Sequence, residues 1–293
     1  MRSALVPWIL TLGVSSVFAQ GFPAPPYLRH WGGPGSLPGQ FFEPADLAVA
    51  GDGTVYVVDR GNHRIQRFTA EGAFLLEWSQ STEQSSFNNP TGIDIDASGN
   101  VYVADTSIHL FTASGAYTRT IRGPTYRVAV DDGEVYGAVY DSVFVETPTG
   151  QVLRGWTIPE ASMGNLHAVC LFADGRLAVT WPIMDRIFVM ERHGSQQTSW
   201  GGNFGVLNSL ASDGKLVYVA DLGRSEIVVL TLEGTEIGSF PVTVPQLGAL
   251  RPVSIAFSDQ GELYVVADSY VVVYAAPTAV ESTTWSKIKS LFR

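Results

Sequence analysis

The sequence predicts an all-β protein in which six four-stranded antiparallel units form a closed ring, and three observations lead to this prediction. Residues 44–78 contain four short apolar runs of period two, which are separated by turns that include Gly53, residues 59–62 and Gly72. Such alternation between tight turns is typical of an antiparallel meander. The unit recurs along the chain, and its last copy lacks one strand that the N-terminal segment can supply. Repetition of a four-stranded unit predicts a β-propeller.

Turn glycines define the repeat. One glycine precedes the second predicted strand of each unit, at Gly53, Gly99, Gly133, Gly175, Gly214 and Gly261. These glycines recur about every 40 residues, which is the length of one propeller blade. A second glycine precedes the fourth strand of the first five units, at Gly72, Gly115, Gly150, Gly194 and Gly234. The sixth unit ends near residue 276, so we expect residues 27–32 to complete it as its outer strand and to close the ring.

Residues 44–74 and 90–105 also carry a family resemblance. The run PADLAVAGDGTVYVVDRGNHRIQRFTAEGAF resembles an NHL repeat, and the match is most specific at Asp59 and at residues 61–65. PTGIDIDASGNVYVAD is similar, whereas later units keep mainly the strand pattern, with Val139 and Trp181 where the family has Asp. The resemblance spans residues 27–276 and implies an NHL-type six-bladed propeller.

The two ends of the chain lie outside this repeat. Residues 1–19 combine Arg2, a short apolar stretch and a Val-Phe-Ala ending, which predicts a signal peptide cleaved before Gln20. That apolar stretch is shorter than the ~20 residues that span a bilayer. Residues 20–26 form a proline-rich lead-in, and residues 277–293 a linker with a short, basic, amphipathic tail. We therefore expect a secreted or periplasmic protein with no membrane span.

Composition restricts the partners. The formal net charge is −10, so an acidic surface would repel a phosphate backbone, and we expect no binding to nucleic acid. Cys170 is the only cysteine, which excludes internal disulfides. The length accommodates one propeller, which we expect to be monomeric.

The long loops are predicted to lie at one end of the ring. Links between blades, such as residues 32–42, 79–89, 157–165 and 239–251, emerge on the same side as the turns between second and third strands. We call this end the long-loop face, and the opposite end, with its Asp-Gly turns, the short-turn face. Because binding sites are usually built from loops on a rigid scaffold, the long-loop face is the predicted binding surface for a protein, peptide or glycan.

Polar residues in the innermost strands are the candidate ligand-binding residues. Asp94 stands where the alignment puts Ala48, Ala129, Cys170, Ser209 and Ala256 in the other blades. Four more polar residues fall near the start of their own innermost strands, where the channel opens: Asp46, Arg127, His167 and Ser254. These five residues line either a polar-ligand pocket or a water-filled channel. The repeated Asp59, Asp105, Asp221 and Asp268 are instead predicted to accept hydrogen bonds from turn N–H groups.

An enzyme is the alternative to a binding module. Related six-bladed scaffolds include amidoglycolate lyases and lactonase or arylesterase types, which hold Zn²⁺ or Ca²⁺ on the axis. Of five histidines only His167 is placed to approach the axis, and a calcium site from Asp46, Asp94 and Asn208 has no recognisable spacing. We find no catalytic motif, so the sequence favours an exported, non-catalytic binding module without a cofactor. A metal-dependent lyase or hydrolase with an axial ion remains the alternative.

Overall fold

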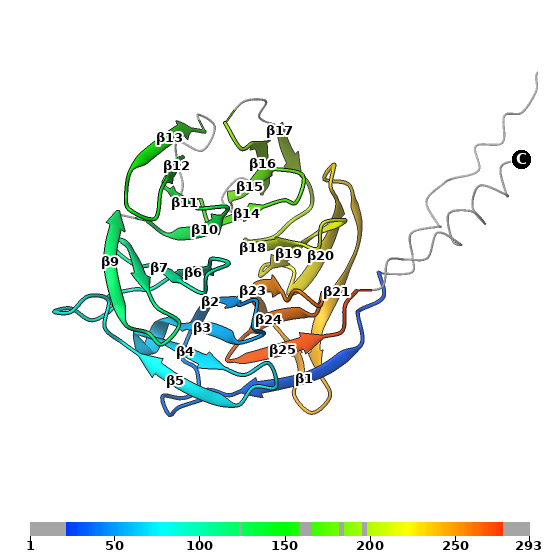
Figure 1. The fold of residues 1–293 in the computed structure, drawn as a ribbon. Helices are drawn as coiled ribbons and strands as arrows, with labels where there is room; N and C mark the ends of the chain where they lie inside the picture. Colours follow the sequence, from blue (N-terminus) through cyan, green and yellow to red (C-terminus); the bar gives the residue numbers. More distant parts are fainter. Residues whose placement is uncertain (1–21, 123–124, 159–165, 182–184, 195–197, 278–293) are drawn as a thin grey trace, which may run out of the picture.

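The computed structural model describes residues 22–122, 125–158, 166–181, 185–194 and 198–277, and it confirms the predicted fold class. Six antiparallel sheets stand around a common axis (Figure 1). Within the described residues the only helical element is one 3₁₀ turn, η1 (Arg60–Asn62), and no helix there has the length and apolar character needed to cross a bilayer. The predicted signal peptide and the C-terminal tail lie outside the described residues.

Four blades follow the chain from the axis to the rim. Blade 1 contains β2 (Pro44–Val49), β3 (Val55–Asp59), β4 (Arg64–Phe68) and β5 (Phe74–Trp78). Blade 2 contains β6 (Gly92–Ile95), β7 (Val101–Ala104), β8 (Ile108–Phe111) and β9 (Tyr117–Arg122). Blade 3 contains β10 (Arg127–Asp131), β11 (Glu134–Val139), β12 (Ser142–Glu146) and β13 (Val152–Thr157). Blade 4 contains β14 (Ala168–Leu171), β15 (Arg176–Trp181), β16 (Arg186–Glu191) and β17 (Thr198–Gly201).

Blade 5 departs from the four-stranded prediction. Its strands are β18 (Leu207–Ser212), β19 (Leu216–Asp221), β20 (Glu226–Thr231), the long β21 (Glu236–Val244) and β22 (Gly248–Leu250). Most of the predicted loop 239–251 is therefore a hairpin. Phe240, Val242 and Val244 are buried on one face of β21, and this period-two pattern explains why the segment continues as a strand despite its prolines.

Blade 6 contains β23 (Pro252–Phe257), β24 (Leu263–Ala267) and β25 (Tyr270–Tyr274), and the N-terminal β1 (Tyr27–Gly32) completes it. β1 runs antiparallel to β25, with Trp31 opposite Val271, and Figure 1 shows the two ends of the propeller side by side. The Arg29 guanidinium bonds Glu262 at 2.8 Å within blade 6 and also donates through Nε to the Ala70 carbonyl of blade 1. The predicted ring closure is thus confirmed.

Packing between blades explains two repeated residue types in the sequence. The Trp78 ring of blade 1 lies against Gly115 in the next blade, where a Cβ atom would come within 2.8 Å of the ring. Gly115 also has φ +79°, a conformation that side chains other than glycine rarely adopt. The same contact joins Trp31 to Gly72, Trp156 to Gly194 and Trp200 to Gly234. Each outer-strand tryptophan therefore fits against the next blade only because a glycine stands there.

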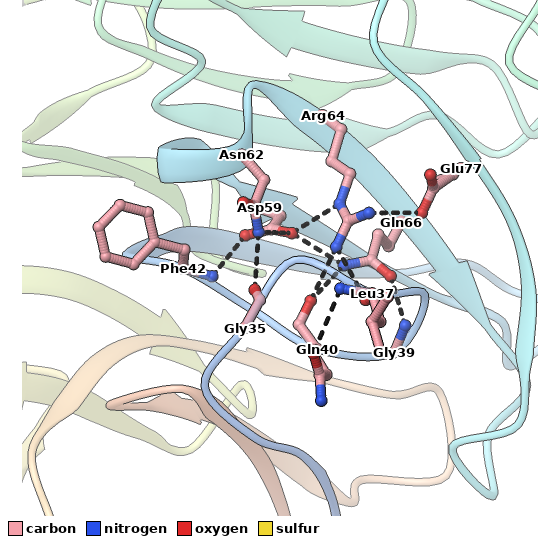
Figure 2. A network of polar contacts seen from close by, with 10 residues as sticks. All are labelled: Gly35, Leu37, Gly39, Gln40, Phe42, Asp59, Asn62, Arg64, Gln66 and Glu77. Atoms are coloured by element: carbon pink, nitrogen blue, oxygen red, sulfur yellow. Dashed lines mark hydrogen bonds and ion pairs between the residues drawn. The ribbon is translucent and has the colours of Figure 1, made fainter.

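The repeat aspartates fasten the links between blades. Asp59 is fully buried and accepts hydrogen bonds from the Phe42 backbone N–H (2.8 Å) and from the Arg64 side chain (2.7 Å), within the network shown in Figure 2. In blades 2, 5 and 6 the equivalent carboxylates also accept backbone N–H groups of the preceding link, at residues 88–89, 205–206 and 251. We predicted that these aspartates accept N–H groups of the turn. They accept mainly N–H groups of the preceding link, because that link runs beside the end of the second strand.

Candidate functional site

A cavity of about 710 Å³ opens at the long-loop face. It is lined by residues of the blade links and of the turns between second and third strands, among them Phe42, Arg60, Tyr126, Leu222 and Arg251. Arg127 and His167 lie deeper, where β10 begins and just before β14. The volume falls within the range of small-molecule sites, about 300–1,000 Å³.

Arg127 is held by the neighbouring blade. Its Nε donates a hydrogen bond to the His167 carbonyl oxygen. Burial lowers the pKa of Arg127, and the positive charge of Arg60 acts in the same direction, while Asp46 opposes them. Among the described residues, no hydrogen-bond acceptor or carboxylate lies within bonding distance of either terminal nitrogen of this guanidinium. The N–H donors of these nitrogens are therefore available to a ligand.

His167 lies beside this guanidinium. Burial lowers the pKa of His167, the charge of Arg127 lowers it further, and a hydrogen bond with Asn208 opposes both effects. The imidazole is consequently neutral at pH 7. Its buried Nδ1 has no hydrogen-bond partner among the described residues.

A second cavity, of about 630 Å³, opens at the short-turn face. Its lining includes Asp46, Asp94, Asp131, Asp213 and Asp259. Arg127, which reaches both cavities, is its only cationic residue among those described. Burial raises the pKa of Asp94 to about 7, with Asp46 and Asp131 adding repulsion, and it also raises the pKa of the Cys170 thiol to about 12. The channel is therefore acidic at one end and cationic at the other.

The polar residues of the innermost strands join neighbouring blades. Asp46 accepts the Ile93 backbone N–H of blade 2 at 3.0 Å, and Asp94 accepts the Val130 N–H of blade 3 at 2.7 Å. The amide of Asn208 in blade 5 donates to the Val253 carbonyl of blade 6 at 2.6 Å. The axial edge of each innermost strand pairs with no further strand, so its backbone groups need other partners. Side chains of adjacent blades supply these partners.

Four of the five predicted residues line the two cavities, and Arg127 lines both. Arg127 and His167 lie together at the long-loop face, whereas Asp46 and Asp94 line the short-turn cavity. Ser254 is 1% exposed and donates to Asp46. The innermost strands bring all five close to the axis, but among the described residues they line two separate cavities and not one channel mouth.

One alignment in the sequence analysis was wrong. Asp94 lies opposite Tyr102, and the residue opposite the equivalent Tyr218 of blade 5 is Ala211, not Ser209. The turn between β18 and β19 differs from that of blade 1, since Ser212 faces Val217 whereas Val49 faces Val55, and the turn glycine therefore stands at another place relative to the strand pair. Ser209 instead occupies the place of Asp46 and Ser254, and lies 3.3 Å from the Ser254 hydroxyl.

The calcium site considered from the sequence would need three oxygen ligands in one place. Asn208 lines the long-loop cavity, whereas Asp46 and Asp94 line the other, so these three residues do not form the calcium site considered from the sequence. Within the described ranges, no group of three or more His, Cys, Asp or Glu side chains is arranged to hold a metal ion.

Comparison with known proteins agrees with the repeat pattern. Residues 41–68 and 87–110 match the NHL repeat family, in the blades where the motif is most complete. The protein is a six-bladed β-propeller with NHL repeats. This NHL propeller is 46% identical over 68 residues to the human E3 ubiquitin-protein ligase TRIM32, a match that covers 23% of the chain but 9% of TRIM32. Over 92 residues it is 30% identical to Protein brain tumor of Drosophila melanogaster, covering 29% of the chain and 9% of that protein.

Solved structures share the fold of the NHL propeller. Virginiamycin B lyase from Staphylococcus aureus, in a catalytically inactive form with quinupristin, superposes with a TM-score of 0.62 at 18% identity, covering 81% of this chain and 82% of the lyase. A chain of a nidogen/laminin complex gives a TM-score of 0.58 at 16% identity, covering 67% and 79%. At such identities the likeness establishes the fold alone.

Sequence reasoning missed much of the long-loop cavity. Tyr126, Arg60 and Arg251 line it but carry no motif. Only their position could have indicated that they line the cavity: Tyr126 and Arg251 directly precede an innermost strand, and Arg60 directly follows a second strand. From the sequence we considered Asn208 only as a calcium ligand together with Asp46 and Asp94, whereas it lines the long-loop cavity.

Proposed function

We propose that this propeller is an exported, non-catalytic binding module whose partner occupies the long-loop cavity. The observation that carries the proposal is the cavity itself, which combines apolar walls with terminal N–H groups of Arg127 that have no partner among the described residues. The partner classes are protein, peptide or glycan. Nucleic acid is disfavoured by the net charge of −10.

The polar residues nearest the axis support a non-catalytic role. Asp46, Asp94 and Ser254 are occupied by hydrogen bonds between blades. A carboxylate used in this way is less available as an acid, base or metal ligand. The fold that the chain shares with virginiamycin B lyase does not by itself carry the activity of that enzyme.

Site-specific photo-crosslinking tests the proposal. A photoreactive residue at Phe42, which is exposed and lines the cavity, should crosslink to a partner in extracytoplasmic fluid of the producing cells. The matched control is Ser98, exposed in a turn at the short-turn face. Ser269→Trp, which fills the cavity, should abolish the product. Equal crosslinking from both positions, or a product that survives Ser269→Trp, would contradict the proposal.

Export has a separate test. The short apolar segment and the Val-Phe-Ala ending support a mature N-terminus at Gln20. Intact-mass measurement of the exported protein should give a chain that begins there, with or without cyclisation of the glutamine. A mass that includes Met1 would remove this part of the proposal.

A further inference from the structure

We propose that the long-loop cavity binds a monoanionic carboxylate attached to an apolar body, and that Arg127 holds the carboxylate. This inference rests on the proposed function, since it names the ligand class of the same cavity. Its first support is the geometry of Arg127. The bond from Nε to the His167 carbonyl fixes the guanidinium, and its two terminal nitrogens have no partner among the described residues. A fixed guanidinium with free terminal N–H groups matches the two oxygens of a carboxylate.

The charges around the cavity select a single negative charge. Three cationic side chains line it, Arg60, Arg127 and Arg251, together with two anionic ones, Glu43 and Asp268. Arg60 bonds Glu43 at 3.2 Å, and Arg251 bonds Asp268 at 2.9 Å. Both rim arginines are therefore paired, whereas no described carboxylate in the lining of this cavity pairs with Arg127; Asp46, in the lining of the other cavity, attracts its guanidinium without a hydrogen bond.

The neutral state of His167 keeps this balance at pH 7. Burial and the adjacent Arg127 lower the pKa of the imidazole, so it adds no second positive charge. A monovalent carboxylate balances the charges of the described residues that line this cavity, whereas a phosphate dianion would add an excess negative charge close to Glu43 and Asp268. An unpaired buried charge is costly, so the monoanion is favoured.

The walls of the cavity specify the remainder of the ligand. Phe42, Leu166, Leu222 and Val253 line it, together with Pro34 and Ala45. These residues offer apolar contact next to one cationic anchor. Two sources present this chemistry: a free aliphatic or aromatic acid, and the C-terminal carboxylate of a peptide that ends in an apolar residue.

Calorimetry with matched acid and amide probes tests the inference. The probes are 4-phenylbutyrate and its amide, and the peptide Gly-Gly-Phe as free acid and as C-terminal amide. On the unaltered protein each acid should bind about tenfold to hundredfold more tightly than its amide, because a hydrogen bond to a charged group is lost in the amide. The stronger of the two acids identifies the source. Sulfate and phosphate should bind more weakly than either acid.

Variants assign the effect to Arg127. Arg127→Gln should weaken acid binding by a similar factor and leave amide binding unchanged, while Arg127→Lys should retain part of the affinity. Arg186→Gln is the control, since Arg186 is exposed in blade 4 and bonds Ser199 outside the cavity. Thermal melts confirm that each variant is folded. The acid and amide comparison needs no variant, so it stands if Arg127→Gln fails to fold.

The outcomes separate this inference from the proposed function. If acid and amide bind equally and Ser269→Trp blocks both, the cavity is the binding site but the carboxylate assignment is wrong. If phosphate binds more tightly than the acids, the proposed preference for a monoanion is also wrong. If no acid binds at millimolar concentration while Phe42 crosslinks a partner, the inference fails and the proposed function stands. If both experiments fail, both proposals fall.

Discussion

Ser254 in blade 6 donates a 2.5 Å hydrogen bond to Asp46 in blade 1, across the boundary where the ring closes. The same Asp46 carboxylate accepts the Ile93 N–H of blade 2, so one side chain connects three blades. At the rim, β1 completes blade 6 by pairing with β25, and its Arg29 side chain donates to the Ala70 carbonyl of blade 1. The closing seam is therefore fastened both at the axis and at the rim.

The rim half of this seam can be removed by truncation. A chain that starts at Gly39 lacks β1 and with it the contact of Trp31 with Gly72. Loss of a packed tryptophan alone costs about 3 kcal/mol, and β25 becomes an open edge. We expect this shorter chain to have a lower melting temperature, and a less cooperative unfolding transition, than the chain that starts at Gln20. Superimposable melting curves would show that the ring is closed by other contacts.

The contact between Trp78 and Gly115 predicts a difference between two glycine substitutions. Gly115→Ala and Gly99→Ala both place a side chain at positive φ, +79° and +82°, which costs about 1 kcal/mol. An added Cβ atom meets the Trp78 ring only at Gly115, since nothing lies within 4 Å at Gly99. Overpacking adds about 1–3 kcal/mol. Denaturant unfolding should therefore show a larger loss for Gly115→Ala, and equal losses would refute the packing account.

Stability should depend on pH through Asp94. Its pKa is raised from 3.8 to about 7 in the folded protein, so the folded state binds this proton more tightly than the unfolded state. The stability that protonation provides is complete below about pH 4 and is lost as the pH rises to about 7. Asp94→Asn removes this loss, and its amide oxygen can still accept the Val130 N–H.

The variant should therefore be more stable than the unaltered protein by about 1–2 kcal/mol at pH 8, after allowance for solvent in the cavity, and the gain should shrink toward pH 4. Chemical unfolding at the two pH values measures this change. Asp259→Asn is the control, since Asp259 is exposed in the same cavity. A gain that does not vary with pH would exclude Asp94 as its source.

Local sequence signals were sufficient to predict most of the fold. Gly53 and Gly72 mark turns that fix the strand order of blade 1, and the likeness of Trp31 to later outer-strand tryptophans identified the closing strand. The sequence did not predict the hairpin of β21 and β22, because prolines such as Pro241 and Pro245 are more typical of a loop than of a strand. Its strand character depends on burial of Phe240 and Val242 in the assembled protein.

The candidate site was less predictable, because it depends on contacts between blades. Asp94 was recognised as unusual, but its acceptance of the Val130 N–H follows from the position of β10. The division of His167 and Asp46 between two cavities depends on depth along the channel, which a repeat alignment does not contain. The different turn between β18 and β19 likewise displaced the repeat alignment by two positions, from Ala211 to Ser209.

Elemental analysis of the purified protein tests the central claim, that the axial carboxylates connect blades and do not hold a catalytic ion. Asp46 and Asp94 are engaged by the N–H groups of Ile93 and Val130, and the described residues form no set of three ligands. We predict far less than one zinc or calcium ion per chain, and a chelator should leave the melting temperature unchanged. One tightly held ion per chain that is lost in Asp94→Ala would contradict the account and favour the metal-dependent enzyme.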